Sequence, residues 1–244
     1  MRKTLLTGFA AAVCALLPLS CTRTGDEAKG LVRLTLQNDW EVTDVTRSNV
    51  SDYTTLPSED QFKLSITDAG DNEVSVNAAD RSATLAAGNY TARAEFGSTS
   101  EEGFDKPCFS GSSAFTVVGG GTTEVSINVK LANCIVRVET TAQFRNYYND
   151  WTFTVTSGAG TEVAFGKEET RAAFFDAYLI KVQGTLIGQN GKTYNFPLKE
   201  YKNLEPTKCY TLKFDVSNVG GAGITVTFDD TVEEVELGSF ELND

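Results

Sequence analysis

Alternating apolar and polar residues run through most of the chain after residue 30. Val32, Leu34 and Leu36 point one way and their polar neighbours the other, which is the period of two of a half-buried strand. The alternation returns at residues 62–66, 74–76, 90–96, 115–117, 125–131, 134–138, 151–155, 163–165, 178–182, 210–216 and 224–228. A helical period never lasts more than two turns, although residues 143–150 suit a short helical turn. The pattern predicts an all-β protein built from sandwiches.

Polar stretches between these runs predict the loops and turns. Residues 37–61 predict a long loop, and residues 68–72 and 119–121 predict turns. Asn190-Gly191 is the strongest hairpin signal, because both residues suit the positive φ values of a type I′ turn. The apolar residues predicted to face the core include Phe62, Leu64, Tyr90, Phe115, Ile127, Val136, Phe153, Leu212 and Val226.

Two domains are expected, with a boundary at residues 131–133, where one alternating run stops and the next begins. The predicted organisation is a lipoprotein signal peptide at 1–20, a polar tether at 21–29, an N-terminal β-sandwich at 30–132 and a C-terminal β-sandwich at 133–244. A leucine, a turn and a Tyr-Thr that opens a strand occur twice, at residues 85–91 and 204–211. One domain built twice would give that spacing.

Residues 1–21 have the order of a bacterial lipoprotein signal. Arg2 and Lys3 form a positive start, residues 5–17 are apolar, and the small Ser20 precedes Cys21. A helix needs about 20 apolar residues to cross a bilayer, and this apolar stretch is shorter. We therefore expect cleavage before Cys21 and acylation of its thiol; an ordinary signal peptide with a chance cysteine is the alternative.

An acylated Cys21 would hold the mature chain on a membrane by its first residue. Each buried methylene adds about 0.8 kcal/mol of membrane affinity, so a multiply acylated cysteine binds firmly. Thr22 after the cysteine resembles lipoproteins sorted to the outer membrane, and Asp26 and Glu27 resemble an acidic surface-export signal. The expected location is the bacterial outer membrane, surface-exposed and lipid-anchored.

Charge and composition exclude several classes of function. The chain has 33 acidic and 21 basic residues, a formal net charge of −12. Nucleic acid is not an expected partner, because phosphate binding needs clustered Lys and Arg. The chain contains no histidine, which excludes His-based triads, Cys-His nucleophiles and imidazole metal sites. We expect no cofactor and no metal.

Three cysteines, Cys108, Cys134 and Cys209, remain after the expected signal peptide and Cys21. An odd number allows at most one intramolecular disulfide and leaves one thiol over. Their spacing fits no zinc pattern. Burial of all three as small apolar residues is at least as good an interpretation as a disulfide.

The carboxylates do not identify a metal or catalytic site. Asp68, Asp71 and Glu73 lack the spacing of an EF-hand loop, which favours a solvated hairpin tip over a calcium site. The acidic run at 229–236 lies beside the last predicted strands, and such runs are usually solvated faces. A glycosidase needs two carboxylates across a cleft, and no pair can be chosen among 33 candidates.

Several segments, in a fixed order, carry a family resemblance. They are the lipobox at Cys21, a first strand at 30–36 followed by residues 45–47, and the segments 85–94, 109–117, 129–134 and 147–151. In this order they resemble the fimbrillin-like surface lipoproteins, which include fimbrial anchor and accessory subunits and similar two-domain lipoproteins. The resemblance covers nearly the whole mature chain. It implies two tandem transthyretin-like or Ig-like β-sandwiches and no catalytic activity.

The resemblance also implies a function in cell adhesion or fimbria assembly, as an anchor or accessory subunit. In polymerising members of the family, an arginine-directed protease cuts after the first-strand region, and a donor strand from the next subunit takes that strand's place. Arg47 is the matching arginine, and we expect it to stay uncut so that residues 32–36 are retained. The expected partners are the membrane through the lipid, fimbrial subunits by strand addition, and host or glycan ligands.

Surface carbohydrate binding is the alternative function, with a carboxylate-based glycosidase as a further one. Exposed rows of Trp or Tyr would favour carbohydrate binding, but Trp40 and Trp151 are the only tryptophans, and Trp151 alternates with predicted core positions. Residues 230–232 resemble a three-residue O-glycosylation motif of some Gram-negative periplasmic systems, which makes Thr231 a candidate site.

Overall fold

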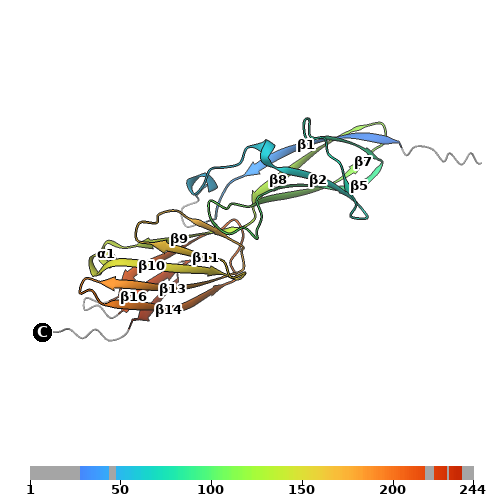
Figure 1. The fold of residues 1–244 in the computed structure, drawn as a ribbon. Coiled ribbons are helices and arrows are strands. Elements are labelled where there is room, and N and C mark those ends of the chain that lie inside the picture. The colour runs from blue at the N-terminus through green and yellow to red at the C-terminus, as the bar shows by residue number, and fades with distance from the viewer. Residues whose placement is uncertain (1–27, 44–47, 218–222, 230, 238–244) are drawn as a thin grey trace, which may run out of the picture.

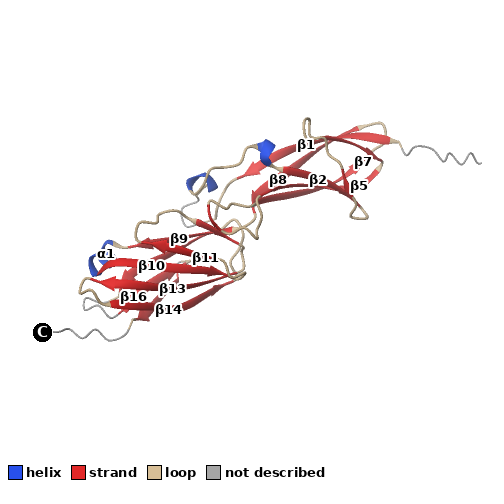
Figure 2. Ribbon diagram, viewed as in Figure 1, coloured by secondary structure: helices blue, strands red, loops and turns tan. Residues whose placement is uncertain are grey.

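Strands make up nearly all the regular structure (Figure 2). The computed structural model describes residues 28–43, 48–217, 223–229 and 231–237. The helical elements among them are α1 (Ala142–Tyr147) and the single 3-10 turns η1 (Val50–Asp52) and η2 (Glu59–Gln61). Thr141 caps α1, because its hydroxyl accepts a hydrogen bond from the Phe144 backbone N–H at 3.1 Å. The predicted all-β class is confirmed, and α1 is the predicted helical turn.

The N-terminal sandwich contains one long sheet that folds into two layers. Its strands are β1 (Lys29–Asp39), β2 (Lys63–Asp68), β3 (Glu73–Val74), β4 (Ser82–Ala86), β5 (Gly88–Phe96), β7 (Phe109–Val117) and β8 (Thr122–Leu131), in the order β3-β2-β5-β7-β8-β1-β4. β7 and β8 pair only through Phe109–Leu131 and Ser110–Lys130. The sheet bends at this short pairing, and the layers β3-β2-β5-β7 and β8-β1-β4 enclose a common core.

The first strand lies inside its layer rather than at an edge. Residues 31–39 of β1 pair in parallel with residues 122–130 of β8, and residues 29–33 pair antiparallel with β4. The side chains of Val32 and Leu34 are buried. β1 is therefore hydrogen-bonded on both edges along its first half and contributes to the core.

The C-terminal sandwich has two separate sheets. Its strands are β9 (Cys134–Thr140), β10 (Tyr148–Ser157), β11 (Glu162–Gly166), β12 (Ala173–Phe175), β13 (Leu179–Gly188), β14 (Thr193–Lys202), β15 (Cys209–Val216), β16 (Gly223–Phe228) and β17 (Thr231–Glu236). One sheet has the order β11-β10-β13-β14. The other has the order β17-β16-β15-β9-β12-β6, and β6 (Gly103–Phe104) comes from the N-terminal part of the chain.

The two sandwiches share one scheme of strand pairing. The first strand of each, β1 or β9, is parallel to β8 or β15 and antiparallel to β4 or β12. The opposite layers, β3-β2-β5-β7 and β11-β10-β13-β14, also match strand for strand. The similar sequences at 85–91 and 204–211 are not the repeat, however. Tyr90 opens β5, which is equivalent to β13, whereas Tyr210 lies in β15, which is equivalent to β8.

Figure 1 shows the two sandwiches end to end. Backbone pairing crosses the junction in both directions. Gly103 and Phe104 in β6 pair antiparallel with Phe174 and Ala173 of β12. In the other direction, Thr43 forms a parallel bridge with Lys208. The core of the N-terminal sandwich also includes four residues from the C-terminal half: Ile135, Ala172, Phe174 and Cys209. The division into domains between residues 132 and 133 stays a prediction. The N-terminal half contributes β6 to a C-terminal sheet, and the C-terminal half contributes four residues to the N-terminal core.

Most of the predicted core positions are buried. Phe62, Ile127, Val136, Phe153, Leu212 and Val226 are buried, while Leu64, Tyr90 and Phe115 are half-buried against the N-terminal core. The prediction is wrong for Tyr178, which starts the alternating run at 178–182. Its side chain is 67% exposed, because it lies in the loop before β13 rather than in the alternating strand.

The Asn190-Gly191 hairpin is present, but its turn is not type I′. The loop contains three residues, since the Gly188 N–H donates to the Lys192 carbonyl and the Gly191 N–H donates to the Gly188 carbonyl. Gly191 has φ +75°, whereas Asn190 is not among the residues with positive φ. This is a turn followed by a left-handed glycine, the usual form of a three-residue hairpin loop.

All three cysteines are buried as free thiols, which supports their interpretation as small apolar residues. Burial raises the pKa of Cys134 to about 12 and that of Cys108 to about 11. Both thiols therefore stay protonated at neutral pH.

Candidate binding site at the junction of the sandwiches

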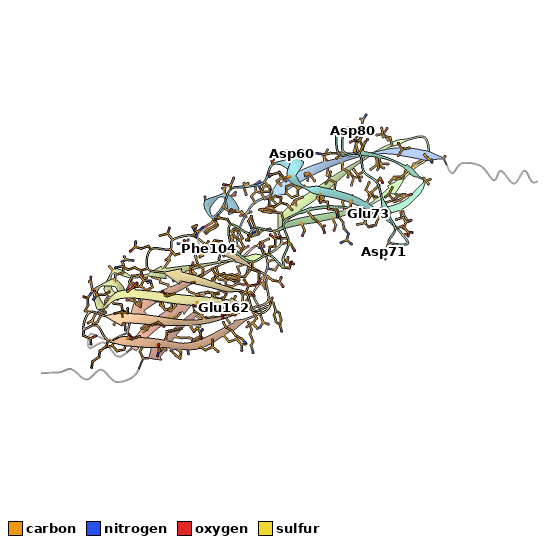
Figure 3. The ribbon with its side chains drawn as sticks, in the orientation of Figure 1. Asp60, Asp71, Glu73, Asp80, Phe104 and Glu162 are labelled. Atoms are coloured by element: carbon orange, nitrogen blue, oxygen red, sulfur yellow. The ribbon has the colours of Figure 1, made fainter. Side chains whose placement is uncertain are left out.

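A cavity of about 480 Å³ opens beside the junction, between two loop segments of the N-terminal sandwich. One wall consists of residues 54–57 with Gln61, and the other of residues 96–98, 101 and 105–107. We call this space the junction cavity. Its volume lies within the about 300–1,000 Å³ typical of small-ligand sites. Figure 3 places Phe104 where the two sandwiches meet.

Local backbone geometry shapes both walls of the junction cavity. On the first wall, the Gln61 side-chain oxygen accepts hydrogen bonds from the backbone N–H and the hydroxyl of Ser58, at 2.8 and 3.1 Å. These bonds join the last residue of η2 to the residue that caps its start. On the second wall, Gly97 has φ +71°, and a Cβ there would stand 2.5 Å from the Pro107 carbonyl oxygen. Only glycine allows the chain to turn this close to Pro107.

The floor of the junction cavity is apolar. Leu56, Pro57, Phe96 and Pro107 line it, and the half-buried Phe96 ring packs at 5.8 Å from Phe62 and 6.2 Å from Phe109 between centroids. The ring is therefore held from behind by the aromatic residues of the core, while part of it lies at the cavity.

The rim of the junction cavity is polar and its charges are paired. The Glu101 carboxylate lies 3.2 Å from the Lys106 ammonium. The Asp105 carboxylate lies 3.1 Å from the guanidinium of Arg171, which belongs to the C-terminal half. Thr54, Thr55 and Ser98 add hydroxyl groups to the rim.

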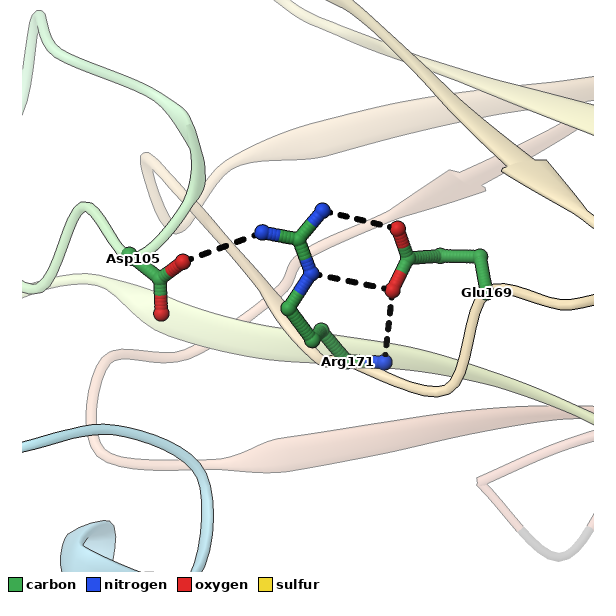
Figure 4. Close-up of polar contacts among 3 residues, drawn as sticks. All are labelled: Asp105, Glu169 and Arg171. Atoms are coloured by element: carbon green, nitrogen blue, oxygen red, sulfur yellow. Dashed lines mark hydrogen bonds and ion pairs between the residues drawn. The ribbon is translucent and has the colours of Figure 1, made fainter.

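Arg171 links the two halves at this rim (Figure 4). Its Nε and Nη2 donate to the two carboxylate oxygens of Glu169 at 3.0 and 2.8 Å, while Nη1 donates to Asp105. The guanidinium also lies over the Phe104 ring, 4.4 Å from its centroid. The hydrogen bonds from Arg171 lower the pKa of Glu169 to about 2, so this carboxylate is ionised at neutral pH.

Glu102 makes a second link across the junction. One oxygen of its carboxylate accepts from the Ser157 hydroxyl at 2.5 Å, and the other accepts from the Asp176 backbone N–H at 2.9 Å. Asn133 is fully buried nearby. Its side chain accepts from the Cys108 N–H at 3.2 Å and donates to the Lys106 carbonyl at 3.0 Å, which supports the far wall of the junction cavity.

A second cavity, of about 410 Å³, lies in the C-terminal sandwich among β14, β15 and the turn between β16 and β17. Its aromatic residues cover one another, because Tyr201 stacks on Phe228 at 4.0 Å and Phe228 on Tyr210 at 5.2 Å. The Lys208 ammonium lies over the Tyr210 ring and pairs with Asp229 at 2.7 Å. The rings that line this cavity therefore pack on one another and under the Lys208 ammonium.

One buried polar group at this second cavity is unsatisfied. The Tyr201 hydroxyl has no hydrogen-bond partner among the described residues, and burial raises its pKa to about 12. A buried hydroxyl without a hydrogen-bond partner lowers the stability of the folded protein, because it has lost its hydrogen bonds to water.

Of the site residues predicted from the sequence, Thr231 is the one that the structure describes. Cys21 and Arg47 lie outside the described residues. On either side of Arg47, the Val42 N–H donates to the Ser48 carbonyl and Glu41 forms an antiparallel bridge with Asn49. Thr231 is exposed at the start of β17 and lines the second cavity.

The carboxylate of Asp68 acts within the first turn itself. The Asp68 carboxylate accepts from the backbone N–H groups of Gly70 and Asn72 at 2.8 and 2.9 Å. The Asn72 side chain also donates to both oxygens of this carboxylate, and these side-chain bonds, together with the backbone bonds, lower the pKa of Asp68. The described residues contain no group of three or more His, Cys, Asp or Glu placed to hold a metal ion. They also include no helix long and apolar enough to span a bilayer.

The sequence analysis missed the junction cavity. Its walls come mainly from irregular loops, including the connection between β5 and β7. These loops carry no periodic pattern of apolar residues from which a wall could be predicted. The only local signs were Phe96-Gly97 at the end of a strand and the polar segment before Pro107.

Comparison with known proteins identifies the family of the chain. The model of the family described as a domain of unknown function (DUF4493) matches residues 28–241, so the chain belongs to that family. No curated protein sequence matches the chain significantly.

Several solved structures are similar in fold. A proposed polysaccharide-binding protein from Bacteroides thetaiotaomicron is 12% identical with a TM-score of 0.46, over 86% of this chain and 99% of that one. A proposed adhesin from the same species has the same identity and TM-score, over 88% and 100%. A fimbrial assembly protein from Parabacteroides distasonis is 10% identical with a TM-score of 0.43, over 85% and 98%. The resemblance predicted from the sequence is to the same kinds of protein.

Proposed function

We propose that this protein acts in cell adhesion or fimbria assembly on the bacterial surface, as a non-catalytic anchor or accessory subunit. The observation that carries the proposal is the elongated body of two like-built sandwiches joined by strand pairing, in which β1 begins at the end far from the C-terminal sandwich and runs toward the junction (Figure 1). A tether attached before β1 would present the C-terminal sandwich away from the membrane.

Deletion of the gene tests this role directly. A strain without the protein should carry fewer fimbriae in electron micrographs or attach less to a host-cell layer, and the wild-type gene should restore the phenotype. Unchanged fimbriae together with unchanged attachment would contradict the proposal.

The proposed attachment is a lipid on Cys21 in the outer membrane. The charged, apolar and small-residue order that ends at Cys21 supports it. Cells grown with labelled fatty acid should label the wild-type protein but not the Cys21→Ser variant, and a labelled variant would refute this anchor.

The proposed anchor or accessory role requires that β1 stays in the protein. β1 has ladders to both β8 and β4, and Val42 after it is fully buried. The Thr43 N–H donates to the Thr207 carbonyl, and the Cys209 N–H donates to the Thr43 carbonyl, so this segment is also fastened to the C-terminal half. A single cut after Arg47 would leave all these contacts in place.

N-terminal sequencing of protein taken from cell surfaces tests β1 retention. We expect a chain that starts at Cys21 and contains Val32, whereas a start at Ser48 would identify a polymerising subunit. In a parallel experiment, an arginine-specific protease that nicks the purified protein at Arg47 should leave both fragments co-eluting in size-exclusion chromatography until denaturant is added.

O-glycosylation at Thr231 is a minor part of the proposal. The exposure of Thr231 at the start of β17 leaves its hydroxyl accessible. Intact-mass spectrometry of protein from the native host should show a glycan mass that is lost in Thr231→Ala. A glycan mass that persists in that variant would refute the assignment.

A further inference from the structure

The junction cavity combines an aromatic floor with a polar rim. The half-buried Phe96 ring and Leu56 supply apolar surface, and Thr54, Thr55 and Ser98 supply hydroxyl groups. A sugar ring has the matching chemistry, because its C–H groups pack on an aromatic ring while its hydroxyls form hydrogen bonds. A purely apolar ligand would leave the rim groups unpaired, which costs free energy.

The rim offers both hydrogen-bond donors and acceptors. Gln61 uses its side-chain oxygen on Ser58, which leaves its NH₂ group as a donor. Glu101 is an acceptor and Lys106 a donor, held 3.2 Å apart. Neighbouring hydroxyls of a sugar both donate and accept, so one ring can satisfy an adjacent carboxylate and ammonium at the same time.

The paired charges select against charged ligands. Glu101 is balanced by Lys106, and Asp105 is balanced by Arg171 at 3.1 Å. An anionic ligand would approach the two carboxylates, and it would also approach a chain of net charge −12. A cationic ligand would have to displace Lys106 or Arg171. A neutral ligand requires neither.

The walls are fixed before any ligand arrives. Asn133 holds the Lys106 and Cys108 backbone from the interior, and Gly97 fits closely against Pro107. Arg171 ties Asp105 to the C-terminal half. A pre-formed site loses less conformational entropy on binding than a mobile one.

From these four observations, we infer that the junction cavity binds a neutral saccharide. The inference rests on the proposed function in adhesion, and it assigns the ligand that the attachment role needs. The residues assigned to contact the sugar are Phe96 at the floor and Thr55, Gln61, Ser98, Glu101 and Lys106 at the rim.

Native affinity gel electrophoresis of the full chain tests the site. The gels contain galactomannan, xyloglucan, arabinoxylan or glycogen as neutral probes and polygalacturonate as the anionic probe, with serum albumin as the non-binding reference. At least one neutral polysaccharide should slow the wild-type protein relative to albumin, and polygalacturonate should not. Retardation by none of the neutral probes, or only by polygalacturonate, overturns the inference.

Two variants assign the binding to the junction cavity. Glu101→Gln/Lys106→Met removes the paired charges without changing the net charge, and Thr55→Ile replaces a rim hydroxyl with a bulkier apolar group. Loss of one or two hydrogen bonds to a neutral ligand should weaken the affinity about tenfold in each variant. The matched control is Lys63→Met/Glu95→Gln, a cross-strand Lys–Glu pair of β2 and β5 on the exposed face of the same sandwich.

The control should bind like the wild-type protein, and thermal melts should show that all variants fold. Equal affinity of wild-type and cavity variants overturns the site. The binding assay and the gene deletion together separate the two proposals. If the purified protein binds a neutral polysaccharide through the cavity, but loss of the gene changes neither attachment nor fimbriae, the adhesion role fails while the site stands. If attachment needs the protein but no neutral polysaccharide binds, the site fails while the adhesion role stands.

Discussion

The equivalent inner strands β5 and β13 fill their cores with different side chains. β5 contributes the small residues Ala92 and Ala94, whereas β13 contributes Ile180, Val182 and Leu186. The two strands have the same neighbours in the shared pairing scheme. The scheme therefore does not depend on particular side-chain sizes, provided that apolar residues alternate on the inner face.

The two sandwiches also differ in how their aromatic side chains pack. In the C-terminal core, Phe153 and Phe214 stack at 3.7 Å, and Phe144 packs against both. In the N-terminal sandwich, Tyr90 and Phe115 stack at 5.8 Å but remain half-buried. The N-terminal core is completed by Phe174 from the other half. We therefore expect the C-terminal sandwich to be the more stable one, and the N-terminal sandwich to depend on it.

The largest effect should come from the aromatic centre of the C-terminal core. Phe153→Ala removes a fully buried ring and should cost about 3–5 kcal/mol of unfolding free energy. Phe115→Ala removes a half-buried ring of the N-terminal sandwich and should cost clearly less. Urea denaturation measures both, with Leu198→Ala at an exposed position as the control. Equal losses for the two Phe variants would contradict the comparison.

Phe174→Ala tests the dependence of the N-terminal sandwich on the other half. The ring is fully buried in the N-terminal core although its strand, β12, belongs to the C-terminal sandwich. Its removal should cost about 3–5 kcal/mol. Hydrogen exchange should show the larger loss of protection in β1, β5 and β8. If protection falls mainly in β10 and β13 instead, the two cores are not shared in the way described.

A smaller effect is expected at the hairpin of β13 and β14. Gly191→Ala places a Cβ at φ +75°, where no neighbouring atom lies within 4 Å, so backbone conformation alone sets a cost of about 1 kcal/mol. Gly166→Ala is the matched control, because Gly166 has open space around it and no positive φ. A melting temperature that falls equally in both variants would argue against the left-handed turn.

The smallest effect should come from the exposed contact between Glu169 and Arg171 at the junction. The folded-state pKa of Glu169 is lowered from 4.5 to about 2, so its ionised form stabilises the folded protein. That contribution is complete above pH 4.5 and is lost as the pH falls toward 2. Denaturant midpoints of wild type and Glu169→Gln should therefore differ at pH 7 and converge at low pH. A difference that persists at pH 2 would contradict this origin.

The strands could be predicted wherever burial on one side imposes a period of two. β1, β10 and β15 follow their predicted alternation, because each has one face in a core. Tyr178 is the exception, since an apolar residue just before a strand keeps the period without facing the core. Asn190-Gly191 predicted a hairpin correctly but not its type, because the loop length depends on the register of β13 and β14.

The sequence by itself determined the all-β class, the positions of the strands and most of the core-facing residues, because these depend on the alternation of side chains along a strand. It also contained the candidate lipid attachment at Cys21. Only the tertiary structure decided that β1 pairs with both β4 and β8, that β6 joins the other sandwich and that Phe174 completes a core outside its own half. The junction cavity belongs to this second group. Its floor, rim and the Arg171 contact join residues from loops far apart in the chain, and no local period encodes such contacts.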